Sequence, residues 1–178
     1  MNLHLGCGRN IKEGYVNIDA YVDDPRVIKA EITDIPYPKN SADEILAEHV
    51  FEHLGFAEEE RLFRECFRVL RIGGKLIVET PDMEWLCRAF LVAKDEFKEF
   101  YQVESIDHYF GNGRTTEQRW GMITTHFFGN QNGPGQFHRN GYTIGKFQAI
   151  SKMIGFSTCD VTTLFNKGAQ AIRATFVK

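Results

Sequence analysis

Residues 1–19 read MNLHLGCGRNIKEGYVNID, and this stretch decides the fold of the 178-residue chain. A short apolar strand over residues 2–5 leads into Gly6-Cys7-Gly8, and a second strand over residues 15–18 ends in Asp19. Closely spaced glycines let the backbone approach a ligand because no Cβ intervenes. An acid at the end of the next strand can accept hydrogen bonds from ribose hydroxyls. The stretch predicts a nucleoside-type cofactor at the carboxyl edge of a parallel sheet, although the glycine pair alone also fits an ordinary tight turn.

Strand and helix patterns alternate through the first half of the chain. Strands are predicted over residues 27–32, 44–47 and 75–80, and the clearest helix covers residues 58–71, where apolar residues recur at helical spacing. Gly73-Gly74 is expected to end this helix. The alternation favours a parallel sheet with crossover helices.

The second half adds two helices and a closing pair of strands. One helix begins at Asp82 and extends to about Tyr101, and another covers residues 143–154, with Thr143 as its cap and Gly155 after it. Residues 160–165 and 171–177 read as two final strands.

Five short motifs occur in one order and spacing that resembles a class I S-adenosylmethionine-dependent methyltransferase of the "methyltransferase domain 11" type. The resemblance covers about the first 85 residues. It implies a three-layer α/β sandwich, with a Rossmann-like, mostly parallel sheet of about seven strands and a C-terminal antiparallel hairpin, and a single domain over residues 1–178. The motifs are Leu5-Gly6-Cys7-Gly8, Val16-Asn17-Ile18-Asp19, Ile35-Pro36-Tyr37-Pro38-Lys39-Asn40-Ser41-Ala42-Asp43, Glu48-His49-Val50-Phe51-Glu52-His53-Leu54 and Arg68-Val69-Leu70-Arg71-Ile72-Gly73-Gly74-Lys75-Leu76.

The same resemblance implies S-adenosylmethionine as the cofactor and assigns its contacts. The glycine motif lies beneath the methionine part, Asp19 holds the ribose hydroxyls, Glu31 reads the adenine amino group, and the backbone N–H of Ile32 faces an adenine ring nitrogen. Glu48 and His49 lie beside the transferred methyl group. The full set of implied cofactor-binding residues is Leu5, Gly6, Cys7, Gly8, Arg9, Asp19, Ala20, Glu31, Ile32, Glu48 and His49.

The first connection departs from the family pattern. His4 stands where an acid usually precedes the glycines, and Asn10 stands where a small residue is common. Only ten residues separate Gly8 from Asp19, too few for a full helix followed by a strand. That helix would normally aim its N-terminus at the cofactor carboxylate. Arg9 or the backbone N–H groups of the short loop are expected to take its place.

The segment His49-Val50-Phe51-Glu52-His53 also matches the H-x-x-E-H signature of inverted zinc proteases. It directly follows a predicted strand, however, and the sequence offers no convincing third ligand. We therefore predict no bound metal and a structural role for Glu52 and His53, and keep a zinc hydrolase as an alternative function.

Residues 102–142 form a long polar segment, rich in glycine and aromatic residues, and are predicted to be a substrate lid. A lone histidine is more often structural than catalytic, but this segment contains three. His138, then His126, are predicted to act at the acceptor together with His49.

Composition narrows the class of partner and the compartment. The net charge is −3, so the chain lacks the excess of basic residues that binds nucleic acid. It also gives no reason to expect binding to a membrane surface. No signal peptide or membrane span is evident, and the four scattered cysteines suit the cytoplasm. The pattern leaves the oligomeric state open.

The sequence as a whole predicts methyl transfer from S-adenosylmethionine to a small-molecule or sugar-like acceptor. The short first loop also allows a protein that binds the cofactor without catalysis.

Overall fold

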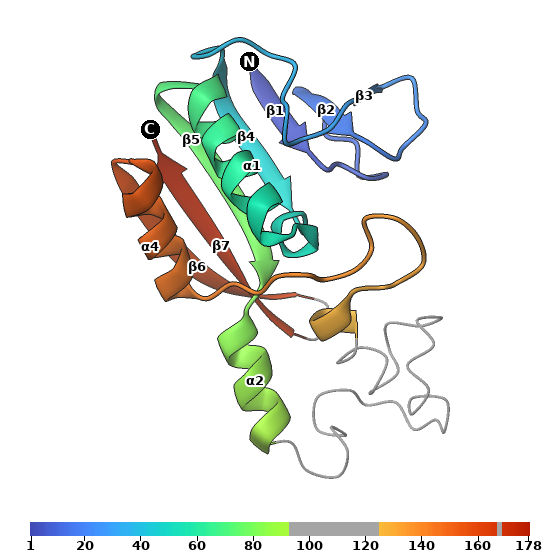
Figure 1. Ribbon diagram of the computed structural model, residues 1–178, viewed down its shortest axis with the longest axis vertical. Helices are drawn as coiled ribbons and strands as arrows, with labels where there is room; N and C mark the ends of the chain where they lie inside the picture. The colour runs from blue at the N-terminus through green and yellow to red at the C-terminus, as the bar shows by residue number, and fades with distance from the viewer. Residues whose placement is uncertain (93–124, 167–168) are drawn as a thin grey trace.

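The computed structural model describes residues 1–92, 125–166 and 169–178 of the chain (Figure 1). Its strands form one sheet of seven in the order β3-β2-β1-β4-β5-β7-β6. The first five strands in sequence are parallel where they pair, and β7 runs antiparallel to both β5 and β6. The predicted α/β class, the strand number and the C-terminal hairpin are confirmed. The strands are β1 (Asn2–Leu5), β2 (Tyr15–Asp19), β3 (Val27–Lys29), β4 (Ala42–Glu48), β5 (Leu70–Pro81), β6 (Thr158–Asn166) and β7 (Ala169–Val177).

The helices whose bounds the structure gives in full are the short 3-10 helix η1 (Phe51–His53), α1 (Phe56–Val69), α2 (Met83–Val92) and α4 (Ile144–Ile154). The caps predicted for α4 are present: the Thr143 hydroxyl accepts from the Lys146 N–H at 3.2 Å, and Gly155 has φ 99°. Within the described parts of the chain, no helix has the length and apolarity needed to cross a membrane.

The predicted ends of two helices need revision. α1 ends at Val69, before Gly73-Gly74, because Leu70 already pairs with Ala42 of β4 and begins β5. The two glycines therefore lie within β5 and do not cap the helix. Asp82 caps α2 as predicted, with its Oδ1 accepting from the N–H groups of Glu84 and Trp85, and the stretch predicted to reach Tyr101 continues outside the described residues.

One face of the sheet carries the apolar core. Alternate residues of each strand point to that face, and they pack against the buried stripes of α1 and α4, which also contact each other (Figure 1). Aromatic rings join the layers: the Phe63 and Phe147 rings of the two helices both contact Phe176 of β7, with centroids 5.6 and 5.7 Å apart. The core therefore fixes α1 and α4 relative to the strands whose ends form the site.

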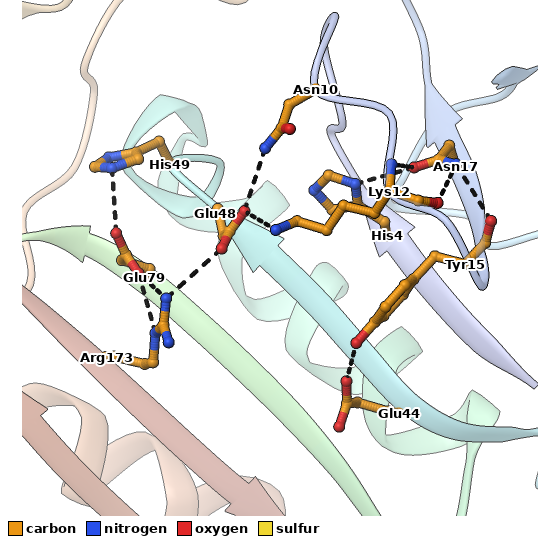
Figure 2. Close-up of polar contacts among 10 residues, drawn as sticks. All are labelled: His4, Asn10, Lys12, Tyr15, Asn17, Glu44, Glu48, His49, Glu79 and Arg173. Carbon is orange, nitrogen blue, oxygen red and sulfur yellow. Dashed lines mark hydrogen bonds and ion pairs between the residues drawn. The ribbon is translucent and has the colours of Figure 1, made fainter. Parts of the chain in front are cut away.

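The opposite face of the sheet is polar. It carries His4, Tyr15, Glu44, Glu48 and Arg173, and α1 lies behind the sheet in this view (Figure 2). Of the described helices, α1 and α4 pack on the core face, opposite this polar face. The short β1–β2 and β2–β3 connections add no helix to either face, since neither has room for a crossover helix.

Asn17 holds the unusually short β1–β2 connection. Its amide donates to the carbonyl oxygens of Lys12 and Tyr15, at 3.1 and 3.2 Å, and its Oδ1 accepts from the Lys12 N–H at 3.0 Å. Oδ1 also lies 3.1 Å from Nδ1 of the buried His4 (Figure 2). A side chain on β2 thus replaces the hydrogen bonds that a helix would provide.

Candidate active site

A cleft of about 430 Å³ opens at the carboxyl ends of β1, β2 and β4. Its walls come from the glycine turn after β1, the loops after β2 and β3, the segment around η1, and residues 135–139. Seven of the predicted cofactor-binding residues line it: Gly6, Gly8, Asp19, Ala20, Glu31, Ile32 and His49.

The glycine turn is shaped for close approach of a ligand. Gly6 and Gly8 both have positive φ, 59° and 54°, a conformation that other residues adopt at a cost. No atom lies within 4 Å of the position that a Cβ on Gly8 would occupy, so this residue leaves an open cradle at the cleft. At Gly6, in contrast, a Cβ would meet Val50 at 2.6 Å.

The Asp19 carboxylate accepts hydrogen bonds from both sides of the cleft and can still accept one from a ligand. Its Oδ2 accepts from the Gly8 N–H at 2.9 Å, and its Oδ1 accepts from the N–H groups of Tyr21 and Val22, at 2.8 and 3.2 Å. A carboxylate offers roughly four acceptor positions. Three are occupied, so Oδ2 has one left for a hydroxyl. Asp19 and the open cradle at Gly8 therefore fit a ribose and the chain attached to it.

Four predicted cofactor residues do not line the cleft. Leu5 and Cys7 are buried below it, 0% and 3% exposed, because they belong to the core side of the β1 end. Arg9 is exposed and points elsewhere than the cleft lining. Glu48 pairs with Lys12 at 3.0 Å and with Arg173 at 3.6 Å on the polar face (Figure 2). Glu48 is connected to His49 through Arg173 and Glu79, but of the two only His49 lines the cleft.

His49 lines the cleft in a strained conformation and carries a charge. Its φ of 55° is unusual for a residue with a side chain, and such strain concentrates at functional sites. Nδ1 lies 3.1 Å from Glu52, and Nε2 lies 3.6 Å from Glu79, an ion-pair distance (Figure 2). The hydrogen bond to Glu52, and then the contact with Glu79, raise the pKa of His49 to about 9. At neutral pH it is protonated, so it cannot be the base we considered for the acceptor.

Glu79 is the buried anion of this network, 4% exposed, and Arg173 donates to it at 2.6 Å. His49, with Arg173, lowers the pKa of Glu79 from 4.5 to about 2. Because the folded-state pKa is depressed, this carboxylate stabilises the fold fully above pH 4.5, and the contribution is lost as pH falls through about 2.

We expect Glu79→Gln to lower the free energy of unfolding by about 1.5–3 kcal/mol near neutral pH, the value of a hydrogen bond to a charged group. The difference from wild type should shrink toward about pH 2.5 in urea unfolding. Glu60→Gln, in the exposed pair with Arg64, is the control and should cost less than about 1 kcal/mol. An equal loss at both pH values would contradict the role assigned to Glu79.

The predicted lid lies partly outside the described residues; its end, residues 125–142, supplies part of the cleft wall. This end is attached to η1, because the N–H groups of Arg139 and Asn140 both donate to the Glu52 carbonyl oxygen, at 2.7 and 3.1 Å. Phe137 and Arg139 line the cleft. His138 between them points to the other side.

His138 and His126 therefore do not line the cleft themselves. The Nδ1 of His138 lies 2.8 Å from the His126 carbonyl oxygen, and its ring contacts the ring of His53, with centroids 4.7 Å apart. Burial lowers the pKa of His138, which keeps it neutral near pH 7. His53, to which we assigned a structural role, is the histidine of this pair that lines the cleft.

The sequence interpretation missed several further lining residues. Tyr21 and Phe137 are two of them, and their side chains are 65% and 48% exposed, which is unusual for aromatic residues. The Tyr21 ring lies close to Gly135 on the other wall of the cleft: a Cβ on Gly135 would meet the Tyr21 ring at 2.8 Å. For Phe137 the sequence signal was the aromatic content of the lid segment, which does not show which strand end a residue approaches, and Tyr21 lies outside that segment.

A glycine turn, an acid at the end of β2 and a cleft at this edge of a 3-2-1-4-5-7-6 sheet are the features of a class I methyltransferase fold. Residues 7–78 match the family described as "Methyltransferase domain". This match agrees with the family resemblance predicted from the sequence, over about two fifths of the chain.

Curated relatives agree over a short stretch. Two probable S-adenosylmethionine-dependent methyltransferases, from two strains of Mycobacterium tuberculosis, are each 41% identical over 56 residues, or 32% of this chain. The chain spans about one fifth of the length of these relatives, since the match covers 20% of each.

Solved structures share the fold across 99% of the chain at low identity. A methyltransferase from Methanosarcina mazei has a TM-score of 0.63 at 13% identity, with 91% of that protein covered. A methyltransferase from Archaeoglobus fulgidus has a TM-score of 0.60 at 13% identity, with 85% covered. The Burkholderia thailandensis 1,6-didemethyltoxoflavin-N1-methyltransferase, solved with 1,6-didemethyltoxoflavin and S-adenosylhomocysteine, has a TM-score of 0.61 at 12% identity, with 70% covered. These likenesses confirm the fold.

Proposed function

We propose that this chain binds S-adenosylmethionine in the cleft and transfers its methyl group to a small-molecule or sugar-like acceptor. The observation that carries the proposal is Asp19, which keeps a free acceptor position in a cleft lined by the positive-φ glycines Gly6 and Gly8. The methyltransferase domain match over residues 7–78 supports it independently.

Different residues of the cleft bind different parts of the cofactor. Gly6 and Gly8 leave room for the ligand chain, Asp19 accepts from ribose hydroxyls, and Glu31 with the Ile32 backbone addresses the adenine edge. Once bound, the cofactor supplies a methyl group made electrophilic by its sulfonium. Holding the acceptor in line with that group is the protein's main contribution, and good positioning is worth about 7–11 kcal/mol.

The acceptor end of the cleft is bounded by His49, His53, Phe137 and Arg139. A total volume of about 430 Å³ lies in the range of small-molecule sites. This favours a small acceptor. Since His49 is already protonated and both of its ring nitrogens face carboxylates, it cannot take a proton from the acceptor. His138 is a positioning residue, acting through the ring of His53.

The alternative functions differ in what they require of the cleft. A non-catalytic binding protein needs the same cofactor contacts, so only turnover separates it from an enzyme. A hydrolase built on H-x-x-E-H needs His49 as a metal ligand, yet both ring nitrogens of His49 face carboxylates. The network around His49 thus favours methyl transfer over that hydrolase. The four free cysteines support the cytoplasm as the compartment.

Calorimetric titration with S-adenosylhomocysteine and S-adenosylmethionine tests the central proposal. We expect one site per chain for both, and transfer of a labelled methyl group when a panel of small hydroxyl and amine acceptors is added. Absence of binding at millimolar cofactor would overturn the proposal. Binding without transfer to any acceptor would favour the non-catalytic alternative.

Changing His138 to alanine should leave S-adenosylhomocysteine affinity nearly unchanged and lower kcat, because the side chain lies behind the acceptor end of the cleft. His138→Gln should recover part of kcat if one ring nitrogen is enough for positioning. Thermal unfolding of both variants is the control for folding. Weaker cofactor binding by His138→Ala would make the residue structural.

A further inference from the structure

Two histidines and a buried glutamate meet behind the acceptor end of the cleft. One potential ligand atom from each of Glu52, His53 and His138 lies within 4.8 Å of the others. We propose that these three side chains form a binding site for a divalent first-row metal ion, with zinc as the test ion. This inference does not depend on the proposed methyl transfer.

The unpaired carboxylate oxygen of Glu52 indicates that a ligand binds here. The residue is 1% exposed, and its Oε1 is engaged by Nδ1 of His49 at 3.1 Å. Its Oε2 is buried and has no hydrogen-bond partner. A buried carboxylate oxygen without a partner is costly. A cation bound at Oε2 would satisfy it.

Both histidines are oriented as metal ligands usually are. The Nδ1 of His53 lies 3.1 Å from the Phe137 carbonyl oxygen, and the Nδ1 of His138 lies 2.8 Å from the His126 carbonyl oxygen. A carbonyl oxygen accepts only, so each Nδ1 carries the proton and each Nε2 keeps a lone pair. Metal-binding histidines are typically fixed in this way by a second hydrogen bond.

The surrounding backbone brings the three ligands together. Glu52 and His53 are adjacent in η1, and the carbonyl of Glu52 accepts the N–H groups of Arg139 and Asn140, directly after His138. Ion binding would therefore join η1 to the segment that closes the cleft. His138 is the third metal ligand, which the sequence did not reveal. In the H-x-x-E-H signature His49 would be the ligand in its place.

The donor set selects the kind of ion. Two imidazoles and one carboxylate suit zinc and other first-row divalent ions, whereas magnesium and calcium prefer oxygen donors. Donors about 2.1 Å from a tetrahedral ion lie about 3.4 Å apart, so the three ligand atoms need to approach one another by no more than roughly 1.4 Å. A fourth position would remain for water or an acceptor atom.

Equilibrium titration of the full chain, after treatment with a chelator, tests the site. We expect one zinc per chain in competition with a chromophoric chelator, and a rise in Tm with zinc concentration, because an ion that binds the folded state stabilises it. His53→Gln, His138→Gln and Glu52→Gln should each weaken zinc binding at least about tenfold, since even outer partners of metal ligands cost that much.

The control is Cys87→Ser, which removes an exposed thiol that could bind zinc nonspecifically and should leave the affinity unchanged. Circular dichroism shows whether each variant is folded, and the cobalt-loaded wild type provides an absorption spectrum that reports imidazole coordination without any substitution. Absence of binding at a tenfold excess of zinc, or equal affinity in all three ligand variants, would overturn the proposal.

Discussion

Replacing Asp19 with alanine is expected to weaken S-adenosylhomocysteine binding by about 10- to 150-fold, equivalent to 1.5–3 kcal/mol for hydrogen bonds to a charged group. Asp19 is 7% exposed and already accepts from the N–H groups of Gly8, Tyr21 and Val22. Its loss therefore removes a ribose acceptor and also releases the loops on both sides of the cleft. Calorimetric titration of folded protein measures the effect.

Asp23→Ala is the matched control, because Asp23 lies in the same loop, is exposed and does not line the cleft. It should leave the affinity within about threefold of wild type, as for surface changes of 0.5 kcal/mol or less. If Asp19→Ala bound as tightly as Asp23→Ala, the nucleoside would not lie against Asp19, and the proposed function would lose its main support.

The second large effect is expected at Gly6. Alanine there must adopt a φ of 59°, which costs roughly 1–2 kcal/mol. Its Cβ would also lie 2.6 Å from a Val50 methyl group, and overpacking of this kind adds about 1–3 kcal/mol. Gly6→Ala should accordingly lower the free energy of unfolding by roughly 2–5 kcal/mol and disturb cofactor binding. Denaturant unfolding gives the first quantity.

Gly14→Ala separates the two causes, because Gly14 has φ 79° but no atom within 4 Å of the added Cβ. It should show the backbone cost alone. In the double variant Gly6→Ala/Val50→Ala the steric overlap is absent, so its loss should be smaller than the sum of the single losses. Equal losses for Gly6→Ala and Gly14→Ala would mean that the contact with Val50 is relieved at no cost.

The sequence predicted which residues at the strand ends lie together at the cleft, for a physical reason. Gly6, Gly8 and Asp19 lie at the ends of strands, and parallel strand ends meet at one edge of a sheet. Strand patterns alone therefore place these residues together. The position of the Glu48 side chain was not predicted: the pattern shows where a strand ends, but charges on the polar face, here Lys12 and Arg173, decide where a carboxylate turns.

The acceptor half could not be predicted, because it is assembled across long distances in the chain. His53 contacts the carbonyl of Phe137, 84 residues later, through a hydrogen bond that no periodicity signals. The end of α1 was missed for a local reason. Leu70 continues a helical apolar stripe, and only its pairing with Ala42 shows that β5 has begun. His49 looked like a base until its two carboxylate neighbours were known.

The short connection that Asn17 holds also bears on how the protein folds. Parallel strands normally need a crossover of a dozen or more residues, usually a helix. Here Asn2 pairs with Tyr15, whereas the β5–β7 pairing joins Lys75 to Val177. Closing a short loop costs less entropy than closing a long one. The β1–β2–β3 edge, which includes Asp19, can therefore form early from local contacts, and the rate-limiting step is expected to be the docking of β7 onto β5.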